Sequence, residues 1–209
     1  MAQNDLGDEP TPPASTKRAA YADRLVRKET ATWKRLLNVQ APYQWNLRRQ
    51  ELGKTLDVGC GIGRNLATLA PGSVGVDHNA ASVAIARERG FVAYTSEEFV
   101  SSPHAVVGSF DSMLLAHVIE HMAAELGEKL VREYLPYVKP GGKVFFVCPQ
   151  ERGYKSDATH ERFTTNDDLA ALARSVGLVP ERAASFPFPR FAGRAFTYNE
   201  FNLLATKPA

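Results

Sequence analysis

The segment that most constrains this fold is residues 55–66, TLDVGCGIGRNL, in which three alternating glycines follow a short apolar run. Leu56 and Val58 are typical of the end of a buried strand, and the glycines allow a sharp turn that brings the backbone close to a ligand. We expect a helix over 63–70, so that the amides of the loop and of the helix N-terminus face an acceptor-rich or anionic ligand. The segment predicts a strand, a binding loop and a helix.

The spacing of the glycines separates two classes of cofactor. A dinucleotide-binding loop needs a third glycine three residues after the second, and Arg64 stands at that position. Gly59, Gly61 and Gly63, preceded by Asp57, form a pattern that resembles the first motif of class I S-adenosylmethionine (SAM)-dependent methyltransferases. The resemblance implies that the acid holds the ammonium group of SAM while the glycines pack on its methionine portion. A purely structural strand–turn–helix is the alternative.

A second acid, Asp77, ends the short apolar run SVGVD about twenty residues after Asp57, the separation of one strand–helix–strand unit. A carboxylate at this place can accept both hydroxyls of a ribose. The resemblance implies that Asp77 chelates the ribose of SAM and that His78 and Asn79 neighbour the adenine, whereas a surface-turn aspartate is the alternative. We also expect the cofactor to contact Cys60, Glu97 and Ala116.

Length and composition fit one domain of ordinary size. The chain has 209 residues, of which 44% are hydrophobic and 23% charged, and no apolar run approaches the roughly 20 residues needed to span a bilayer. We expect a disordered N-terminal tail over 1–17, an N-terminal helical cap over 18–50 and the catalytic domain over 51–209. The two cysteines suit a reduced, cytoplasmic protein better than a disulfide framework.

Strands and helices alternate from residue 54 onward, which favours an α/β fold with a parallel sheet and helices on both faces. A helix over 18–38 precedes this region, and the pattern breaks at 41–43, APY. The resemblance implies a Rossmann-like, mostly parallel sheet of seven strands in the order 3-2-1-4-5-7-6, ending in an antiparallel hairpin. We expect strands at 54–58, 73–77, 91–95, 110–115, 142–148, 178–186 and 196–206, and helices at 63–70, 79–89, 96–102, 122–137 and 166–176.

Ligands of such sheets bind at the carboxyl ends of the strands, where the strand order reverses. The fourth strand therefore delivers His117, Glu120 and His121 toward the methyl group of SAM. Their spacing puts them on one face if the turn is helical. His160 follows the neighbouring fifth strand, so it can converge on the same pocket.

This set resembles the E-x-x-E-H motif and distant histidine of the small-RNA 3′-terminal 2′-O-methyltransferases, which bind Mg²⁺, and a motif of the ubiquinone-pathway O-methyltransferases. The resemblance implies a metal site of Glu120, His121 and His160, joined by His117, which replaces the first glutamate. Imidazole is a poorer Mg²⁺ ligand than carboxylate. Metal-free acid–base histidines and purely structural roles are the alternatives, and SAM, with Mg²⁺ on the metal interpretation, is the expected cofactor.

The chemistry of the pocket favours a hydroxyl as methyl acceptor. An aliphatic hydroxyl must lose its proton as the oxygen attacks, which calls for a base or a cation. We therefore expect catalytic roles for the four pocket residues and a nearby tyrosine, namely His117, Glu120, His121, His160 and Tyr154. The chain also resembles small actinobacterial methyltransferases, among which sugar O-methyltransferases occur. Trp45, Tyr154 and the segment 186–191 can form an aromatic wall for a sugar ring, although core packing explains them equally well.

These observations predict a SAM-dependent O-methyltransferase whose partner is a small-molecule acceptor, a saccharide or similar polyol. The net charge of +2 does not favour nucleic acid, and no membrane partner is expected. The alternatives are a methyltransferase of a phenolic, amine or carboxyl metabolite, an RNA 2′-O-methyltransferase, and a non-catalytic SAM-binding partner subunit.

Overall fold

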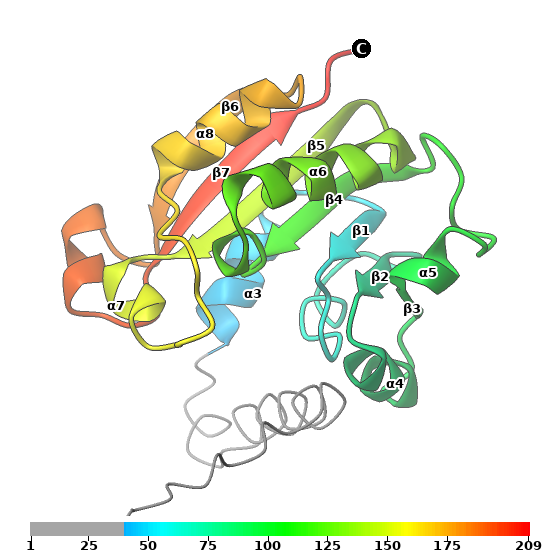
Figure 1. The fold of residues 1–209 in the computed structure, drawn as a ribbon, viewed down its shortest axis with the longest axis horizontal. Helices are drawn as coiled ribbons and strands as arrows, with labels where there is room; N and C mark the ends of the chain where they lie inside the picture. The colour runs from blue at the N-terminus through cyan, green and yellow to red at the C-terminus, as the bar shows by residue number, and fades with distance from the viewer. Residues whose placement is uncertain (1–39) are drawn as a thin grey trace, which may run out of the picture.

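The computed structural model describes residues 40–209, which form a seven-stranded sheet with helices packed on it (Figure 1). The strand order is β3-β2-β1-β4-β5-β7-β6, which confirms the predicted fold class. The strands are β1 (Thr55–Val58), β2 (Val74–Asp77), β3 (Ala93–Thr95), β4 (Phe110–Ala116), β5 (Val138–Pro149), β6 (Val179–Phe186) and β7 (Glu200–Thr206). The α-helices are α3 (Ala41–Arg48), α4 (Ala80–Glu88), α5 (Ser96–Phe99), α6 (Ala124–Tyr134), α7 (Glu151–Tyr154) and α8 (Asn166–Ser175), and the 3₁₀ helices are η1 (Ile119–His121), η2 (Leu135–Tyr137) and η3 (Arg190–Arg194).

The first five strands are parallel. Strands β2 and β3 lie on one side of β1, whereas β4 and β5 lie on its other side. Leu56 of β1 pairs with Val74 of β2 on one side and with Met113 of β4 on the other. The carboxyl ends of β1 and β4 are therefore neighbours at the switch in strand order, where ligands of open α/β sheets bind. The last strand, β7, lies antiparallel between β5 and β6, as the predicted hairpin requires.

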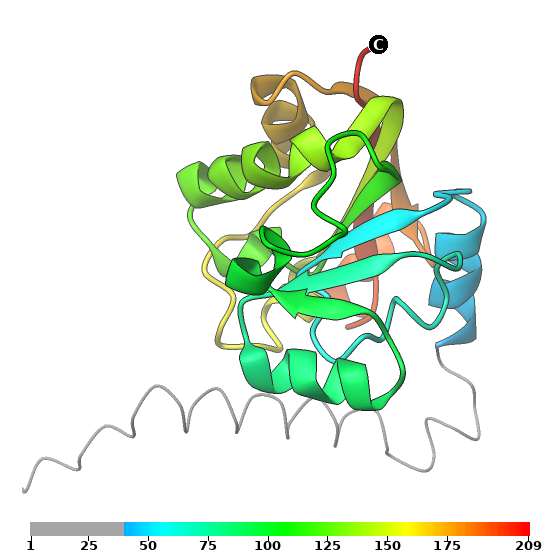
Figure 2. The same ribbon diagram turned by 90° about the vertical axis from the view of Figure 1, so that its right-hand side faces the viewer.

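Alternating side chains of the central strands point to the two faces of the sheet. Met113 and Leu115 belong to the core beneath α6 and α8, whereas Leu114 belongs to a second core that includes Leu47 of α3. Figure 2 shows α3 on the opposite side of the sheet from α6 and α8. Full burial of each such side chain stabilises the fold by roughly 1.5–3 kcal/mol, so the strand ends that carry the site rest on a core from both sides.

The helix predicted over 63–70 does not form, and turns occupy this segment. Gly63 adopts a φ of +79°, which no right-handed helix contains. Because the segment then meets Pro71-Gly72, fewer than two helical turns of chain remain. The loop is therefore held by turns, such as the hydrogen bond from Thr68 N to Asn65 O (2.8 Å), and it offers no helix N-terminus to a ligand.

A second correction concerns residues 41–43, where a break was expected and α3 begins. Proline is well tolerated in the first turn of a helix, because its missing N–H would have no partner there, and Pro42 holds such a position. The expected helix 122–137 is divided into α6 and η2, and Pro136 lies within η2. The tail 1–17 and the helix 18–38 lie outside the described residues. No helix within 40–209 is long and apolar enough to cross a membrane.

Candidate active site

Three glycines shape the loop after β1. Gly59, Gly61 and Gly63 have φ values of +78°, +53° and +79°, in the left-handed region that side chains disfavour. A Cβ atom at Gly59 would lie 2.3 Å from Cγ2 of Val118, and one at Gly63 would lie 2.6 Å from the ring of Phe91. The loop is therefore in direct contact with the turn that follows β4.

Asp57 is fully buried next to this loop, and neither of its carboxylate oxygens has a hydrogen-bond partner within residues 40–209. Burial is the main reason why the pKa of Asp57 rises to about 7, and the negative charge of Asp77 adds to it, whereas Asn65 opposes the shift. A buried carboxylate without partners costs free energy, which a bound cation offsets. The site therefore fits the ammonium group of SAM.

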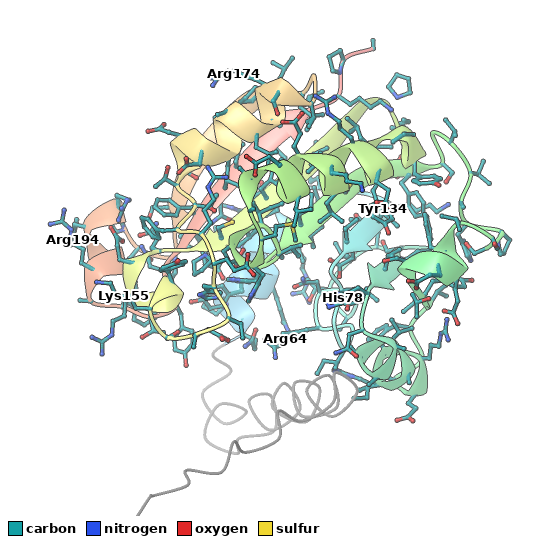
Figure 3. The ribbon with its side chains drawn as sticks, viewed as in Figure 1. Arg64, His78, Tyr134, Lys155, Arg174 and Arg194 are labelled. Carbon is teal, nitrogen blue, oxygen red and sulfur yellow. The ribbon has the colours of Figure 1, made fainter. Side chains whose placement is uncertain are left out.

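Asp77 joins the glycine loop to the end of β2. One carboxylate oxygen accepts a hydrogen bond from the amide of Gly61 and the other from the amide of Asn79, each at 2.8 Å. The side-chain oxygen of Asn79 caps α4 by accepting from Ala81 N at 3.1 Å, which is a structural role. His78 is exposed with Nδ1 3.5 Å from Asp77, and Figure 3 shows it near the carboxyl ends of β1 and β2. Asp77 and His78 therefore lie side by side at the end of β2, and their contacts with ribose and adenine stay predictions.

The remaining predicted cofactor residues differ in their surroundings. The Cys60 thiol packs against Gly75, where an added Cβ would lie 2.6 Å from Sγ, and burial raises the pKa of this thiol well above its usual range. Its side chain is therefore part of the core, and the geometry does not support a cofactor contact through sulfur. Glu97 is exposed in the first turn of α5. Ala116 ends β4 and lines a pocket there.

His117 lies between two carboxylates at the end of β4. Its Nδ1 is 3.2 Å from Oε1 of Glu120 and its Nε2 is 2.9 Å from Oε1 of Glu200. The side chain is 46% exposed. Its partial desolvation disfavours the charged ring, but the two carboxylates outweigh this effect and raise the pKa of His117 to about 10. Both nitrogens of His117 thus face carboxylates, and the group of possible metal ligands among the described residues contains Glu120, His121 and His160 without it. The predicted roles of His117 as base and as metal ligand stay predictions.

Three residues from two segments place possible metal-ligand atoms close together. Atoms of Glu120, His121 and His160 lie within 4.8 Å of each other, and the two imidazole centroids are 4.7 Å apart. The backbone carbonyl of Glu120 accepts hydrogen bonds from the amides of Glu161 (2.8 Å) and Arg162 (3.0 Å). These bonds fasten the loop after α7 to η1, and they bring His160 into the cluster that we expected.

The protonation of this cluster follows from its hydrogen bonds. The Nδ1 atoms of His121 and His160 face the backbone oxygens of Thr159 (3.1 Å) and Tyr154 (2.7 Å). A carbonyl only accepts, so each Nδ1 carries the proton and each Nε2 keeps its lone pair. Burial opposes ionisation of Glu120, yet His117 holds the pKa of that carboxyl below its usual value. Tyr154 also stacks on His160, with ring centroids 5.4 Å apart, and it therefore orients the histidine.

A pocket opens between α3, the glycine loop and the ends of β4 and β5. Most of its side chains are polar, and Arg64 extends from the loop at this edge of the sheet (Figure 3). Sequence reasoning missed the majority of these positions. The lining consists of Gln40, Tyr43, Gln44, Asn46, Leu47, Arg64, Asn65, Thr68, Leu114, Ala116, His117, Phe145, Val147 and Glu200.

Trp45 and Tyr154, expected in one aromatic wall, belong to two separate groups of rings. Trp45 stacks on Phe186 with centroids 6.2 Å apart, and Tyr43 meets Phe186 edge-on. Tyr154 instead packs on His160 and Phe163. No ring contact joins the two groups in the part of the chain that the structure describes, so only the first group adjoins the pocket, through Tyr43.

Comparison with known proteins agrees with this geometry. Residues 56–146 match the family profile of a methyltransferase domain. A SAM-dependent methyltransferase from Archaeoglobus fulgidus superposes with a TM-score of 0.63 at 18% identity, covering 83% of this chain and 97% of that one. No curated protein matches the chain.

Two further solved structures share the fold. A putative methyltransferase from Haloferax volcanii, in complex with the Trm112 methyltransferase activator, has a TM-score of 0.69 at 16% identity and covers 92% of this chain and 98% of that one. The 1,6-didemethyltoxoflavin-N1-methyltransferase from Burkholderia thailandensis has a TM-score of 0.57 at 17% identity, with coverage of 97% and 94%. The strand order and the match over residues 56–146 together show that the chain carries a SAM-dependent methyltransferase domain with the fold of these structures.

Proposed function

We propose that this methyltransferase transfers the methyl group of SAM to a hydroxyl of a saccharide or similar polyol. The observation that carries the proposal is the group of polar side chains among the residues that line the pocket at the end of β4. Gln44 and Asn46 of α3, Asn65 of the glycine loop and Glu200 of β7 all line it. An amide both donates to and accepts from hydroxyl groups, and a carboxylate accepts from them.

The second support is a source of general base catalysis next to this pocket. His117 lies between Glu200 of the pocket and Glu120 of the cluster. His121 and His160 each keep an Nε2 lone pair, since their Nδ1 protons are held by backbone oxygens. Such a nitrogen can accept the proton of an attacking hydroxyl, and a divalent ion such as Mg²⁺ at the same residues would lower the pKa of that hydroxyl.

The reaction is an in-line displacement. The acceptor oxygen forms a bond to the methyl carbon while the carbon–sulfur bond breaks, and both electrons of that bond go to sulfur. The hydroxyl proton passes to the histidine nitrogen. The products are a methyl ether and S-adenosylhomocysteine. In this scheme Asp57 and Asp77 fix the donor, and the pocket aligns the acceptor, because alignment supplies most of the rate enhancement in such displacements.

The test is transfer of a radiolabelled methyl group from SAM to a panel of acceptors. The panel contains mono- and oligosaccharides, phenols, amines, carboxylic acids and RNA 3′ ends, each with and without EDTA. We expect label in saccharides, and a loss of at least about 100-fold in kcat for His121→Ala. His104→Ala is the matched control, because His104 packs on Tyr94 away from the site. Transfer only to phenols, amines, carboxylates or RNA would refute the saccharide acceptor.

A further inference from the structure

We propose that Glu120, His121 and His160 bind a divalent transition metal ion of the Zn²⁺ type in preference to Mg²⁺. The binding itself follows from these three side chains alone. Only its catalytic use rests on the proposed function: an ion bound to both histidines would replace the histidine base, lower the pKa of the acceptor hydroxyl as a Lewis acid and let its proton leave to water.

Hydrogen bonds orient the two histidine rings as metal ligands in the ion-free protein. The backbone oxygen of Thr159 orients His121, and that of Tyr154 orients His160. Each bond fixes the tautomer whose Nε2 lone pair is free. Histidines that bind metals characteristically donate their other N–H to a carbonyl or carboxylate in this way. The stacked ring of Tyr154 further restricts rotation of His160.

Glu120 supplies an observation that points independently to a ligand. Its side chain is 0% exposed, and neither carboxylate oxygen has a hydrogen-bond partner among the described residues. His117 Nδ1 lies 3.2 Å from Oε1, and the buried thiol of Cys148 also interacts with this carboxylate. A buried carboxylate beside two imidazole nitrogens is stabilised by a cation placed between the three side chains.

The donor set favours a particular class of ion. Mg²⁺ prefers oxygen ligands in octahedral geometry and keeps its waters. Imidazole nitrogen suits the first-row transition metals and zinc, and two histidines with one carboxylate form a set that binds Zn²⁺ or Fe²⁺ with further positions open. Because both nitrogens of His117 face carboxylates, this ring adds no fourth ligand and leaves those positions to water or an acceptor oxygen.

To bind one ion, the three ligand atoms need to move only slightly closer together. The ligand atoms lie within 4.8 Å of one another, whereas tetrahedral bonds of about 2.1 Å place ligands about 3.4 Å apart. His121 and Glu120 are adjacent in η1, and His160 lies on a loop between α7 and α8. Side-chain rotation of the two histidines and a small shift of this loop toward η1 are enough to close the site.

The test measures ion binding directly and needs no acceptor. Full-length protein, with any affinity tag removed and metal stripped, is dialysed against Zn²⁺ alone or Mg²⁺ alone, and bound metal is counted by mass spectrometry. Co²⁺ serves as a second probe, because its visible spectrum reports the ligand geometry. We expect one equivalent of Zn²⁺, bound at least about 100-fold more tightly than Mg²⁺.

Variants locate the site. His160→Ala and the more nearly isosteric His160→Asn should each weaken Zn²⁺ binding by about 100-fold or more, while His104→Ala should bind as the unchanged chain does. Thermal melting of each variant establishes that it folds. Absence of Zn²⁺ binding, equal binding by both His160 variants and the unchanged chain, or tighter binding of Mg²⁺ would overturn the proposal. Tight Zn²⁺ binding in a protein that does not methylate saccharides would uphold the metal site and refute only the acceptor.

Discussion

The imidazole of His117 bridges two carboxylates that lie 80 residues apart in the sequence, with Nδ1 3.2 Å from Glu120 and Nε2 2.9 Å from Glu200. The backbone φ of His117 is +60°. Such a value is rare for a residue other than glycine and is characteristic of constrained functional turns. This bridge connects the pocket side of the site to the buried cluster, because Glu200 lines the pocket and Glu120 belongs to the cluster.

Glu200→Gln should lower the pKa of His117 from its value of about 10, because one of the two carboxylates that stabilise the imidazolium is lost. The stability that the charged ring provides is fully present below the unfolded pKa of about 6.5 and disappears as pH rises through 10. The substitution should therefore destabilise the protein more at pH 6 than at pH 10. Histidine NMR titration and urea unfolding at both pH values check this. An unchanged His117 pKa would contradict the bridge.

Asp57→Asn should abolish SAM binding and yet stabilise the ligand-free protein at pH 8. The folded pKa of about 7 exceeds the unfolded value, so ionising the buried carboxyl lowers stability between about pH 4 and pH 7. Removing that charge should raise the free energy of unfolding at pH 8 by about 1–4 kcal/mol. Calorimetric SAM titration and denaturant unfolding measure the two effects.

Asp111→Asn is the matched control for this variant. Asp111 is paired at the surface with Lys139 at 2.7 Å, which holds the pKa of its carboxyl below the usual range. Its loss should leave SAM affinity unchanged and should not stabilise the protein. An Asp57→Asn variant that is destabilised equally at pH 8 and pH 4 would contradict this prediction. It would mean that a partner stabilises the ionised carboxylate of Asp57 in the folded protein.

Gly59→Ala and Gly90→Ala form a pair that separates backbone strain from close packing. Both glycines have positive φ, +78° and +85°, so each alanine costs about 1–2 kcal/mol of strain. Only Gly59 faces a neighbour, Val118, at 2.3 Å from the added Cβ, while Gly90 has nothing within 4 Å. Gly59→Ala should therefore cost at least about 1 kcal/mol more and weaken SAM binding. Adding Val118→Ala to the Gly59→Ala variant should recover part of the lost stability, as measured by urea unfolding. Equal losses of stability at Gly59 and Gly90 would contradict the contact between the glycine loop and the turn after β4.

Gln44→Leu should raise the KM for the saccharide by about tenfold or more with the Kd for SAM little changed. Gln44 lies on α3 and lines the pocket, and loss of its hydrogen bonds to a hydroxyl leaves that group unpaired on binding. Gln44→Asn, which keeps the amide, should have a smaller effect. Steady-state kinetics and calorimetry give the two constants. A larger effect on SAM than on the acceptor would assign this part of the pocket to the donor.

The donor side of the site was predictable from the sequence because its signals are local. The glycine spacing, Asp57 before it and Asp77 one strand later all lie in a single strand–loop–strand unit. The strand order followed from the family resemblance, and alternating segments supported it. By contrast, the expected helix over 63–70 failed because Gly63 has a left-handed φ, a property that the periodicity of apolar residues does not report.

The acceptor side was harder because its residues meet only through tertiary structure. Glu200 gave no signal, yet its position at the start of β7, paired with Pro149 of β5, brings it to His117. The polar residues of α3 lay in a segment expected to interrupt a helix. The role of His117 also depends on partners that no sequence spacing reveals, since an isolated histidine resembles a base whether or not carboxylates surround it.

The central claim is that a hydroxyl of a saccharide receives the methyl group with help from the Glu120–His121–His160 cluster. Its most direct test is NMR analysis of the product formed from ¹³C-methyl-labelled SAM and saccharide acceptors, comparing the unchanged chain with His160→Asn and the control His104→Ala. We predict an O-methyl carbon attached to a sugar ring, formed at similar rates by the unchanged chain and the control and at least about 100-fold more slowly by His160→Asn. A labelled methyl group on nitrogen, on a carboxyl oxygen or on no saccharide at all, or equal rates for all three proteins, would contradict the account.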